Sequence, residues 1–375
     1  MSESSRQAVG IDLGTTFSAV AYLDRSGVPQ TILNMEGDLS TPSVVYFDES
    51  EAVVGKEAVK AAAYEPDSVA QFAKRDMGKP AYHKPIRGVQ LPPEVIQAAV
   101  LQKLREDAEL RLGQVKDVVI TVPAFFNEPR RNATMDAGRL AGLRVVDIIN
   151  EPTAAAIAYG VKAGFVTSSG EVQRRESILV YDLGGGTFDV TLMEIEGSTY
   201  TALATDGDVQ LGGIDWDRRI ADHVAETFIE QLGTDPREDQ AGFQLLLQEA
   251  EDAKRTLSSR SNITIRYSHQ GKRIQVVLTR DELESLTSDL LQRTMFTVEK
   301  LLRDAKRGWS DLTRILLVGG STRMPMVGRA LEEQSGMKVD RSLSPDEAVA
   351  HGAALYAGIL QQGGRATDRN LAVKN

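Results

Sequence analysis

The amino-acid sequence predicts an α/β protein made of two similar lobes that face each other across one central cleft. Three observations lead to this prediction. Short strand-like runs joined by turns are followed by alternating strands and amphipathic helices. The same order of elements returns in the second half of the chain. A short motif is repeated as well: Asp12-Leu13-Gly14 followed by Thr16-Phe17-Ser18 resembles Asp182-Leu183-Gly184 followed by Thr187-Phe188-Asp189.

The composition is that of an ordinary globular protein and excludes several kinds of site. A chain of 375 residues is long enough for two domains, and its net charge of −10 disfavours nucleic acid or an anionic membrane as the main partner. Cysteine is absent, which removes disulfides and thiol chemistry, and the four histidines show no metal-ligand spacing. The sequence has no signal peptide and no apolar run that spans a bilayer, so we expect a cytoplasmic protein.

The first half of the chain is predicted to be a β-meander followed by a βαβα layer. Turn residues separate three strand-like runs, residues 8–13, 18–23 and 31–34. Apolar residues at helical spacing then predict a helix over residues 94–111. A strand, a helix, a strand and a helix follow over residues 117–122, 129–141, 144–149 and 152–160.

The second half repeats this order with an insertion. A second meander is predicted over residues 177–183, 190–195 and 200–205. Helices follow over residues 213–232, 243–257 and 281–306, with a small hairpin at residues 263–267 and 273–278. The last elements are a strand over residues 314–318 and a helix over residues 346–360. Beyond Gly363-Gly364 the chain turns polar, which is typical of a flexible linker.

Two turns rich in glycine and threonine, residues 11–16 and 181–187, carry the clearest functional signal. Each follows a hydrophobic strand and leads back into another strand, so its backbone N–H groups are open to a ligand. Such donors, together with threonine hydroxyls, suit phosphate oxygens. One such turn alone is more simply a tight hairpin, but two matching turns 170 residues apart predict phosphate binding. Asp12 and Asp182, at the strand ends, are placed to hold Mg²⁺ through water.

Other common phosphate motifs are missing. No G-x-x-x-x-G-K-[ST] sequence occurs, and Gly184-Gly185-Gly186 is not followed by a helix as a dinucleotide fingerprint requires. The sequence therefore excludes a P-loop or Rossmann site.

Over residues 8–360 the sequence resembles the nucleotide-binding domain of the seventy-kilodalton heat-shock (DnaK-type) chaperone family, within the actin–hexokinase–chaperone superfamily. The matching segments are residues 11–17, 72–75, 121–127, 149–156, 182–189, 211–213, 251–258, 318–325 and 345–350. The resemblance implies duplicated ribonuclease H-like (actin-like ATPase) domains that form two lobes around a nucleotide cleft. Lobe I would span residues 1–164, with an abbreviated insertion near 76–112. Lobe II would span residues 165–362, with a helical and hairpin subdomain near 214–300, and residues 363–375 would begin an interdomain linker.

The resemblance implies slow Mg²⁺-dependent hydrolysis of ATP to ADP and phosphate, with K⁺ as an optional further ion, in the service of protein folding and the stress response. Lys74 would contact the γ-phosphate and position the attacking water, and Glu151 would hold that water and the water shell of the metal. Asp182 and Thr187 complete the implied catalytic set. Without the resemblance, Lys74 reads as a solvated surface charge, and Glu151, just before Pro152, as a carboxylate favoured at a helix N-terminus.

The resemblance also assigns the ligands of the metal and of the phosphates. The carboxylates implied around Mg²⁺ are Asp12, Asp182 and Asp189. The phosphate-binding positions are Gly14, Thr15, Thr16, Phe17, Gly184, Gly185, Gly186, Thr187, Gly212 and Gly213. A triphosphate needs the metal because the nearby carboxylates would otherwise repel it.

An adenosine pocket is implied by two further segments. Glu251, Lys254, Arg255 and Ser258 share one helix face, where the simpler interpretation is a solvated Glu251–Arg255 ion pair worth a few tenths of a kcal/mol. By resemblance this face binds adenine and ribose, with Arg255 stacking on the base. The opposite wall would be formed by Gly319, Gly320, Ser321, Arg323 and Asp346.

Partner binding is where the sequence departs from the family. Pro123 and Arg131 match residues that relay the nucleotide state. Asp147, however, stands where a J-domain-binding arginine is usual, and residues 79–93 leave little surface for a nucleotide exchange factor. The tail at residues 369–373 lacks the usual linker pattern. We expect a monomer that belongs to a longer protein and reaches unfolded client peptides only through a C-terminal domain absent from this chain.

Three alternatives share the predicted fold. A sugar or acetate kinase would need an acceptor site with a catalytic base, and the sequence shows none. An actin-like filament protein would polymerise with nucleotide, which the acidic surface disfavours. A non-hydrolysing relative would lack part of the set Lys74, Glu151, Asp182 and Thr187, which is complete here.

Overall fold

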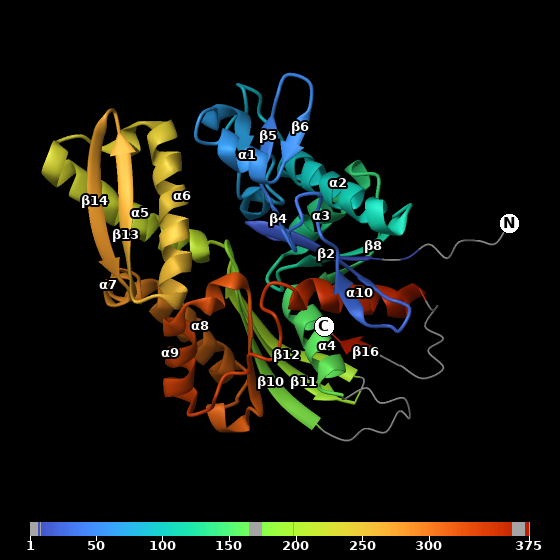
Figure 1. The fold of residues 1–375 in the computed structure, drawn as a ribbon. Coiled ribbons are helices and arrows are strands. Elements are labelled where there is room, and N and C mark those ends of the chain that lie inside the picture. The colour runs from blue at the N-terminus through green and yellow to red at the C-terminus, as the bar shows by residue number, and fades with distance from the viewer. Residues whose placement is uncertain (1–6, 8, 165–174, 198, 362–371, 375) are drawn as a thin grey trace.

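The computed structural model describes residues 7, 9–164, 175–197, 199–361 and 372–374, and two larger β-sheets organise it (Figure 1). The first sheet has the strand order β3-β2-β1-β8-β9, with β4 paired to β2. β1 is antiparallel to β2 and parallel to β8. The strands are β1 (Val9–Asp12), β2 (Phe17–Leu23), β3 (Pro29–Thr31), β4 (Thr41–Pro42), β8 (Asp117–Val122) and β9 (Arg144–Asn150).

The second sheet repeats the plan of the first. Its order is β15-β10-β11-β12-β16, in which β10 is antiparallel to β11 and parallel to β15. The strands are β10 (Arg175–Leu183), β11 (Phe188–Glu196), β12 (Thr199–Asp208), β15 (Arg314–Val318) and β16 (Ala372–Lys374). The series β12-β11-β10-β15 therefore matches β3-β2-β1-β8 in both order and direction, which confirms the internal repeat.

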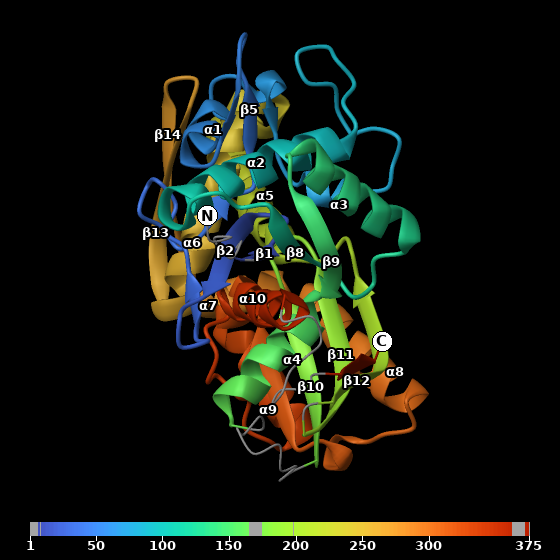
Figure 2. The same ribbon diagram turned by 90° about the vertical axis from the view of Figure 1, so that its right-hand side faces the viewer.

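Two helices, α4 (Glu151–Lys162) and α10 (Ala348–Gln361), lie side by side between the two sheets (Figures 1 and 2). Helix α10 packs on β1, β2 and β8, and α4 packs on β10 and β11. Small residues allow this close approach: a Cβ atom on Gly352 would lie 1.8 Å from the carbonyl oxygen of Ala154, and one on Gly10 would lie 2.1 Å from the nitrogen of Ala354. The helix pair therefore joins the sheets that carry the two glycine- and threonine-rich turns, residues 11–16 and 181–187. These two turns are called the phosphate-type turns.

Four further helices cover the outer faces of the two large sheets. α2 (Pro93–Leu112) and α3 (Glu128–Leu140) share the apolar core of the first sheet. α8 (Ser288–Asp304) and α9 (Pro325–Ser335) share the core of the second. No helix in the described part of the chain is long and apolar enough to cross a membrane.

Two smaller units stand beside the large sheets (Figure 1). One contains β5 (Val45–Phe47), β6 (Ala52–Val54), β7 (Val69–Ala70) and α1 (Lys56–Ala61), with sheet order β6-β5-β7. The other has a separate apolar core formed by α5 (Gly213–Leu232), α6 (Gln240–Ser259), β13 (Asn262–His269), β14 (Lys272–Thr279) and α7 (Arg280–Leu286). These units flank the opening of the cleft described below.

The structure corrects two predicted elements. The single helix expected over residues 281–306 is broken into α7 and α8 at Thr287, whose buried hydroxyl donates to the carbonyl oxygen of Leu283 at 2.7 Å and whose φ of −121° leaves the helical region. The strand expected over residues 31–34 is β3, which ends at Thr31 because the chain then turns through a hydrogen bond from Asn34 N to Asp38 O.

Several elements were not predicted. They are β4, β5, β6, β7, α1 and α9. The expectation of a flexible segment after Gly363 is wrong for residues 372–374, which form β16 and pair in parallel with the free edge of β12. Residues 362–371 and 375 lie outside the described residues, so most of the proposed linker is not placed.

Candidate nucleotide site

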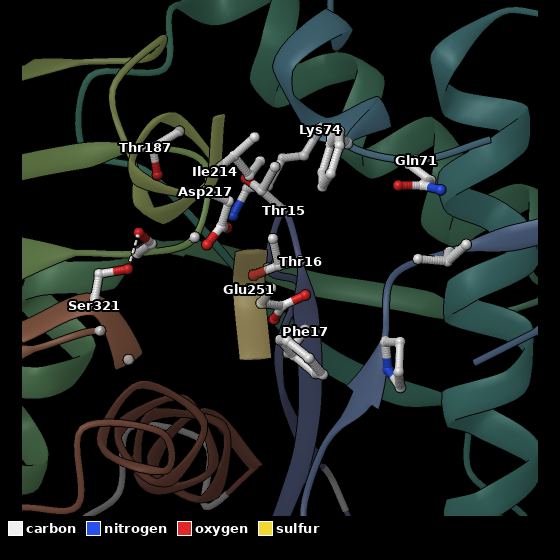
Figure 3. Close-up of a pocket in the computed structure, with 18 of the residues that line it drawn as sticks. Thr15, Thr16, Phe17, Gln71, Lys74, Thr187, Ile214, Asp217, Glu251 and Ser321 are labelled. Atoms are coloured by element: carbon white, nitrogen blue, oxygen red, sulfur yellow. Dashed lines mark hydrogen bonds between the residues drawn. The ribbon is translucent and has the colours of Figure 1, made fainter. Parts of the chain in front are cut away.

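A cavity of about 720 Å³ lies where the two phosphate-type turns, α6 and the segment around Gly319 meet (Figure 3). Most of the residues proposed from the sequence line it. They are Asp12, Gly14, Thr15, Thr16, Phe17, Lys74, Glu151, Asp182, Gly184, Gly185, Thr187, Glu251, Lys254, Arg255, Ser258, Gly319, Gly320, Ser321, Arg323 and Asp346. Four other proposed residues, Gly186, Gly212, Gly213 and Asp189, are not among the residues that line it.

The tips of the two turns approach each other closely. A Cβ atom on Gly185 would lie 2.0 Å from Thr16 Oγ1, and one on Gly186 would lie 2.2 Å from Thr15 Cγ2. Glycine is therefore required where the second turn faces the first. The turns are 170 residues apart in sequence, and the fold brings them into contact.

Hydrogen bonds fix the second turn so that its carbonyl groups are already engaged. The carbonyl oxygen of Gly184 accepts from Gly213 N at 3.0 Å and from Ser321 Oγ at 2.9 Å (Figure 3). Gly185 O accepts from Ile214 N at 2.8 Å. The turn therefore has its N–H groups left for a ligand, apart from Gly184 N, which donates to Thr187 O at 3.0 Å.

Lys74 and Glu151 form a buried ion pair at the wall of the cavity. Lys74 lies in a 3₁₀ turn (Ala73–Asp76) and Glu151 is the first residue of α4, with 2.5 Å between Lys74 Nζ and Glu151 Oε1. Their side chains are 3% and 9% exposed, so Lys74 is not a solvated surface charge. The amino group also lies 6.0 Å from the centre of the Phe126 ring. The carboxylate of Glu151 faces Lys74, so the pair fixes both side chains at the cavity.

Three aspartates near Glu151 lie in a poorly solvated place where negative charge is unfavourable. Burial, with the neighbouring Glu151 carboxylate, raises the pKa of Asp12 to about 7 and the pKa of Asp189 to about 7. The same causes, burial first, raise the pKa of Asp182 well above its usual value of 3.8. Carboxylates in this state gain from a nearby cation, and the donor set fits Mg²⁺. Among the described residues no three Asp, Glu or His side chains converge as direct metal ligands.

Two of these aspartates, Asp12 and Asp189, accept a hydrogen bond from a hydroxyl or from the backbone. Thr121 Oγ1 donates to Asp12 Oδ1 at 3.1 Å. Phe125 N donates to Asp189 Oδ1 at 3.2 Å. Asp189 faces the loop after β8 and is only 1% exposed, which explains why it does not line the cavity.

The face of α6 lies across the cavity from the first turn. Arg255 forms the ion pair with Glu251 at 2.7 Å, and its guanidinium lies 5.0 Å from the centre of the Phe17 ring. This stacking joins the two sides of the cleft and places the guanidinium at the mouth of the cavity. On the opposite wall Arg323 donates to Asp346, and both side chains are about half exposed.

Sequence reasoning missed the partner of Lys254. Lys254 Nζ lies 2.7 Å from the carboxylate of Asp217 and donates to Gly213 O at 2.9 Å. Asp217 lines the cavity, and burial, only partly offset by Lys254, raises its pKa to about 6. Its signal in the sequence was its position in the first turns of a helix that begins at Gly213.

Residues from the short segment after Lys74 also line the cavity, which the sequence did not suggest. They are Tyr82, His83 and Lys84, together with Gln71 and Phe72 before the turn. Gln71 Nε2 donates across the cleft to Gln244 Oε1 at 3.2 Å. In the described segment 79–93 the only β-pairing is an isolated bridge between Ile86 and Val89.

Arg131 and Asp147, which the sequence analysis linked to relay of the nucleotide state and to J-domain binding, do not line the cavity. Arg131 donates to Phe126 O at 3.0 Å and to the side chain of Asn150, next to Glu151. Asp147 lies on β9, and its Oδ2 accepts from Tyr356 Oη on α10 at 2.7 Å. Asp147 is therefore already engaged within the fold.

Comparison with known proteins gives one consistent answer. The family model described as Hsp70 protein matches residues 8–373. The chaperone protein DnaK of Halobacterium salinarum is 44% identical over 364 residues, which cover 95% of this chain and 56% of that protein. The chaperone protein DnaK of Thermotoga maritima is 44% identical over 370 residues, covering 96% of this chain and 60% of that protein. The chain thus spans little more than half the length of these relatives.

Proposed function

The chain belongs to the Hsp70 family and has its actin-like ATPase fold, and we propose that it binds Mg²⁺-ATP and hydrolyses it slowly as the nucleotide switch of a DnaK-type chaperone. The observation that carries the proposal is the meeting of two glycine-threonine turns beside a buried lysine and three poorly solvated aspartates. This arrangement offers donors for phosphate oxygens and carboxylates for a hydrated cation in one place.

The nucleotide is proposed to lie along the cavity from the turns to α6. The phosphates would accept from backbone N–H groups of the turns and from the hydroxyls of Thr15, Thr16 and Thr187. The positions Gly14, Phe17, Gly184, Gly185, Gly186, Gly212 and Gly213 would let the backbone approach. The adenosine would lie between Arg255 and Arg323, which requires Arg255 to exchange the Phe17 ring for the base. Glu251, Lys254, Ser258, Gly319, Gly320, Ser321 and Asp346 would complete that pocket.

A magnesium ion is proposed beside Asp12, Asp182 and Asp189, held through its water molecules. Bound there, it would neutralise charge on the phosphates. Asp12 and Asp182 line the cavity, and Asp189, which is buried, does not. A K⁺ ion is proposed as a further cofactor on the family resemblance alone.

Lys74 and Glu151 are proposed to carry the hydrolytic step. Glu151 would orient a water molecule whose oxygen bonds to the γ-phosphorus while the bond to the β–γ bridging oxygen breaks. ADP leaves with that electron pair, and the water proton ends on the phosphate product. The ammonium group of Lys74 would stabilise charge on the transferred phosphoryl group, which is the main task in this chemistry.

The experiment that tests this function compares single-turnover ATP hydrolysis in the wild type and in Lys74→Ala. We expect the rate to fall by about 10²-fold or more while ATP affinity, measured by calorimetry, changes only a few-fold. Lys60→Ala is the matched control, because Lys60 is an exposed lysine paired with Glu57. Equal hydrolysis in the Lys74 and Lys60 variants would remove Lys74 from the mechanism. Transfer of the phosphate to a sugar or acetate in place of water would favour the kinase alternative.

The partners are a separate proposal. We infer a J-domain cochaperone and an exchange factor as regulators of this ATPase, which we expect to be cytoplasmic and monomeric, and unfolded client peptides as the ligands of the chaperone that it switches. Asp147→Arg should strengthen stimulation by a J-domain even though it removes the hydrogen bond from Tyr356. Val146→Arg, on the same strand and 44% exposed, is the control. Equal stimulation of both variants would show that position 147 does not govern docking.

A further inference from the structure

The short turn that carries Lys74 reaches both sides of the cleft. Lys74 pairs with Glu151 on α4. Arg75, the next residue, donates from Nε to Gly186 O at 2.9 Å and pairs with Asp215 at 2.7 Å. Small movements of this turn would therefore shift the positions of Lys74 and of the second phosphate-type turn together.

The turn has little internal support. Phe72, which precedes it, has φ 59° and ψ 24°, a left-handed conformation that is unfavourable for a bulky residue. Its backbone bonds include one from Arg75 N to Phe72 O at 3.0 Å and one from Met77 N to Lys74 O at 3.3 Å. A strained backbone of this kind persists only when its surroundings hold it.

Tyr82 holds the backbone at Gln71, two residues before the turn. Its hydroxyl accepts from Gln71 N at 3.0 Å and donates to Gln71 O at 2.8 Å, so one side chain engages both backbone groups of Gln71. Tyr82 is 2% exposed, so its hydroxyl has little access to water and is committed to these two hydrogen bonds.

His83 holds the second end through Asp76, the last residue of the turn. Asp76 Oδ2 accepts from His83 Nδ1 at 2.7 Å and from His83 N at 3.1 Å. Its other oxygen accepts from Lys79 Nζ at 2.7 Å. The carboxylate is 5% exposed, so it is committed to these partners.

From this geometry we propose that Tyr82 and His83 form a brace that positions the turn carrying Lys74 and Arg75 for phosphate chemistry. Two consecutive residues hold the chain on both sides of the turn, at Gln71 just before it and at Asp76, its last residue, and both also line the cavity. The inference rests on the proposed function for its catalytic part. It gives the short segment 79–93 a role of its own: the segment supplies the positioning residues of the catalytic turn.

The test uses Tyr82→Phe, which removes the hydroxyl and keeps the buried ring. Losing both hydrogen bonds should speed hydrogen exchange at the amides of Arg75 and Met77 about fivefold or more. The single-turnover rate of ATP hydrolysis should fall about tenfold, because small displacements of a positioned group are costly, while ATP affinity stays within about twofold. Asp76→Asn, which weakens the other end, should move the same readouts in the same direction.

Matched controls are Tyr46→Phe, whose hydroxyl donates to Glu65 on the same side of the cleft, and Asp136→Asn, which loses an exposed pair with Arg139. Unchanged exchange and turnover in Tyr82→Phe would overturn the brace. Faster exchange with an unchanged rate would overturn its positioning role. If the wild type binds ATP without cleaving it, the proposed function fails. In that case hydrogen exchange alone tests the brace. Faster exchange in Tyr82→Phe than in the wild type supports the brace, and equal exchange overturns it.

Discussion

Lys74 and Glu151 depend on each other, because each is buried and each is the other's ion-pair partner. Lys74→Ala should lower the free energy of unfolding by about 3–5 kcal/mol, since it leaves a buried carboxylate unpaired. The double variant Lys74→Ala/Glu151→Ala should recover part of that loss without recovering hydrolysis. Urea denaturation measures both effects.

The control at this scale is Lys60→Ala, which should change the free energy of unfolding by less than about 1 kcal/mol because its pair with Glu57 is exposed. Lys74→Ala must therefore be less stable than Lys60→Ala, and the double variant Lys74→Ala/Glu151→Ala must be no less stable than Lys74→Ala. Failure of either expectation would show that burial of this ion pair is not what couples the two side chains.

Asp189 makes the metal-free protein sensitive to pH. Burial, with Glu151, raises its folded-state pKa from 3.8 to about 7, so the folded state binds the proton more tightly than the unfolded state does. The stability from this group is complete below about pH 4 and is lost as the pH rises through about 7. Asp189→Asn cannot ionise, so the variant does not lose this stability as the pH rises. Its amide oxygen can still accept a hydrogen bond from Phe125 N.

We therefore expect Asp189→Asn and the wild type to be equally stable near pH 4 without metal or nucleotide. Near pH 8 the variant should be more stable by about 4 kcal/mol, since folding raises the pKa of Asp189 from 3.8 to about 7 and each pH unit is worth about 1.4 kcal/mol. Denaturation curves at several pH values measure the difference. A difference that does not change with pH, or a wild type that is the more stable at pH 8, would contradict the electrostatic interpretation.

At the scale of single residues, the sequence identified side chains better than it predicted their surroundings. Lys74 looks solvated when read from its neighbours alone, and only the family resemblance marked it. Its burial depends on Glu151, which is 77 residues away along the chain. Asp217 and Tyr82 were missed for the same reason: their partners, Lys254 and Gln71, become neighbours only in the folded chain.

At the scale of elements, the close approach of the two turns is the feature most open to a test. Gly185→Ala places a Cβ atom 2.0 Å from Thr16 Oγ1 and should push the turns apart. We expect ATP affinity to fall about tenfold or more, because the phosphate donors on the two turns no longer fit one ligand. Gly308→Ala, with its nearest neighbour at 3.7 Å, is the control, and calorimetry is the measurement. Equal affinity in both variants would mean that contact between the turns is not needed for nucleotide binding.

Elements with a clear period or a clear cap were predictable. The strands β8 and β15 and the helix α5 have the predicted bounds. The break at Thr287 was not predictable from glycine or proline, because a threonine hydroxyl makes it. The strands β4 to β7 have two or three residues each, too few for a period of two to show. Helix α9 had usable signals, Pro325 at its start and Gly336 after its end, which the sequence reasoning did not use.

At the scale of the whole molecule, the duplicated sheets explain why one ligand can be held by distant parts of the chain. In the first sheet β1 leads into a glycine-threonine turn, and in the second sheet β10 does. Helices α4 and α10 lie between the two sheets and hold them together. The internal repeat predicted this arrangement. Contacts that cross the cleft, such as Arg75–Asp215, Gln71–Gln244 and Arg255–Phe17, could not be predicted from the sequence, because they depend on how far the cleft is closed.

The most direct measurement of the central claim is a crystal structure of the protein with Mg²⁺ and a non-hydrolysable ATP analogue. We predict the phosphates between the Thr15–Thr16 turn and the Gly184–Thr187 turn, the metal beside Asp12 and Asp182, and the adenine between Arg255 and Arg323. A nucleotide bound elsewhere, or a cavity that stays without nucleotide at saturating concentration, would contradict the account.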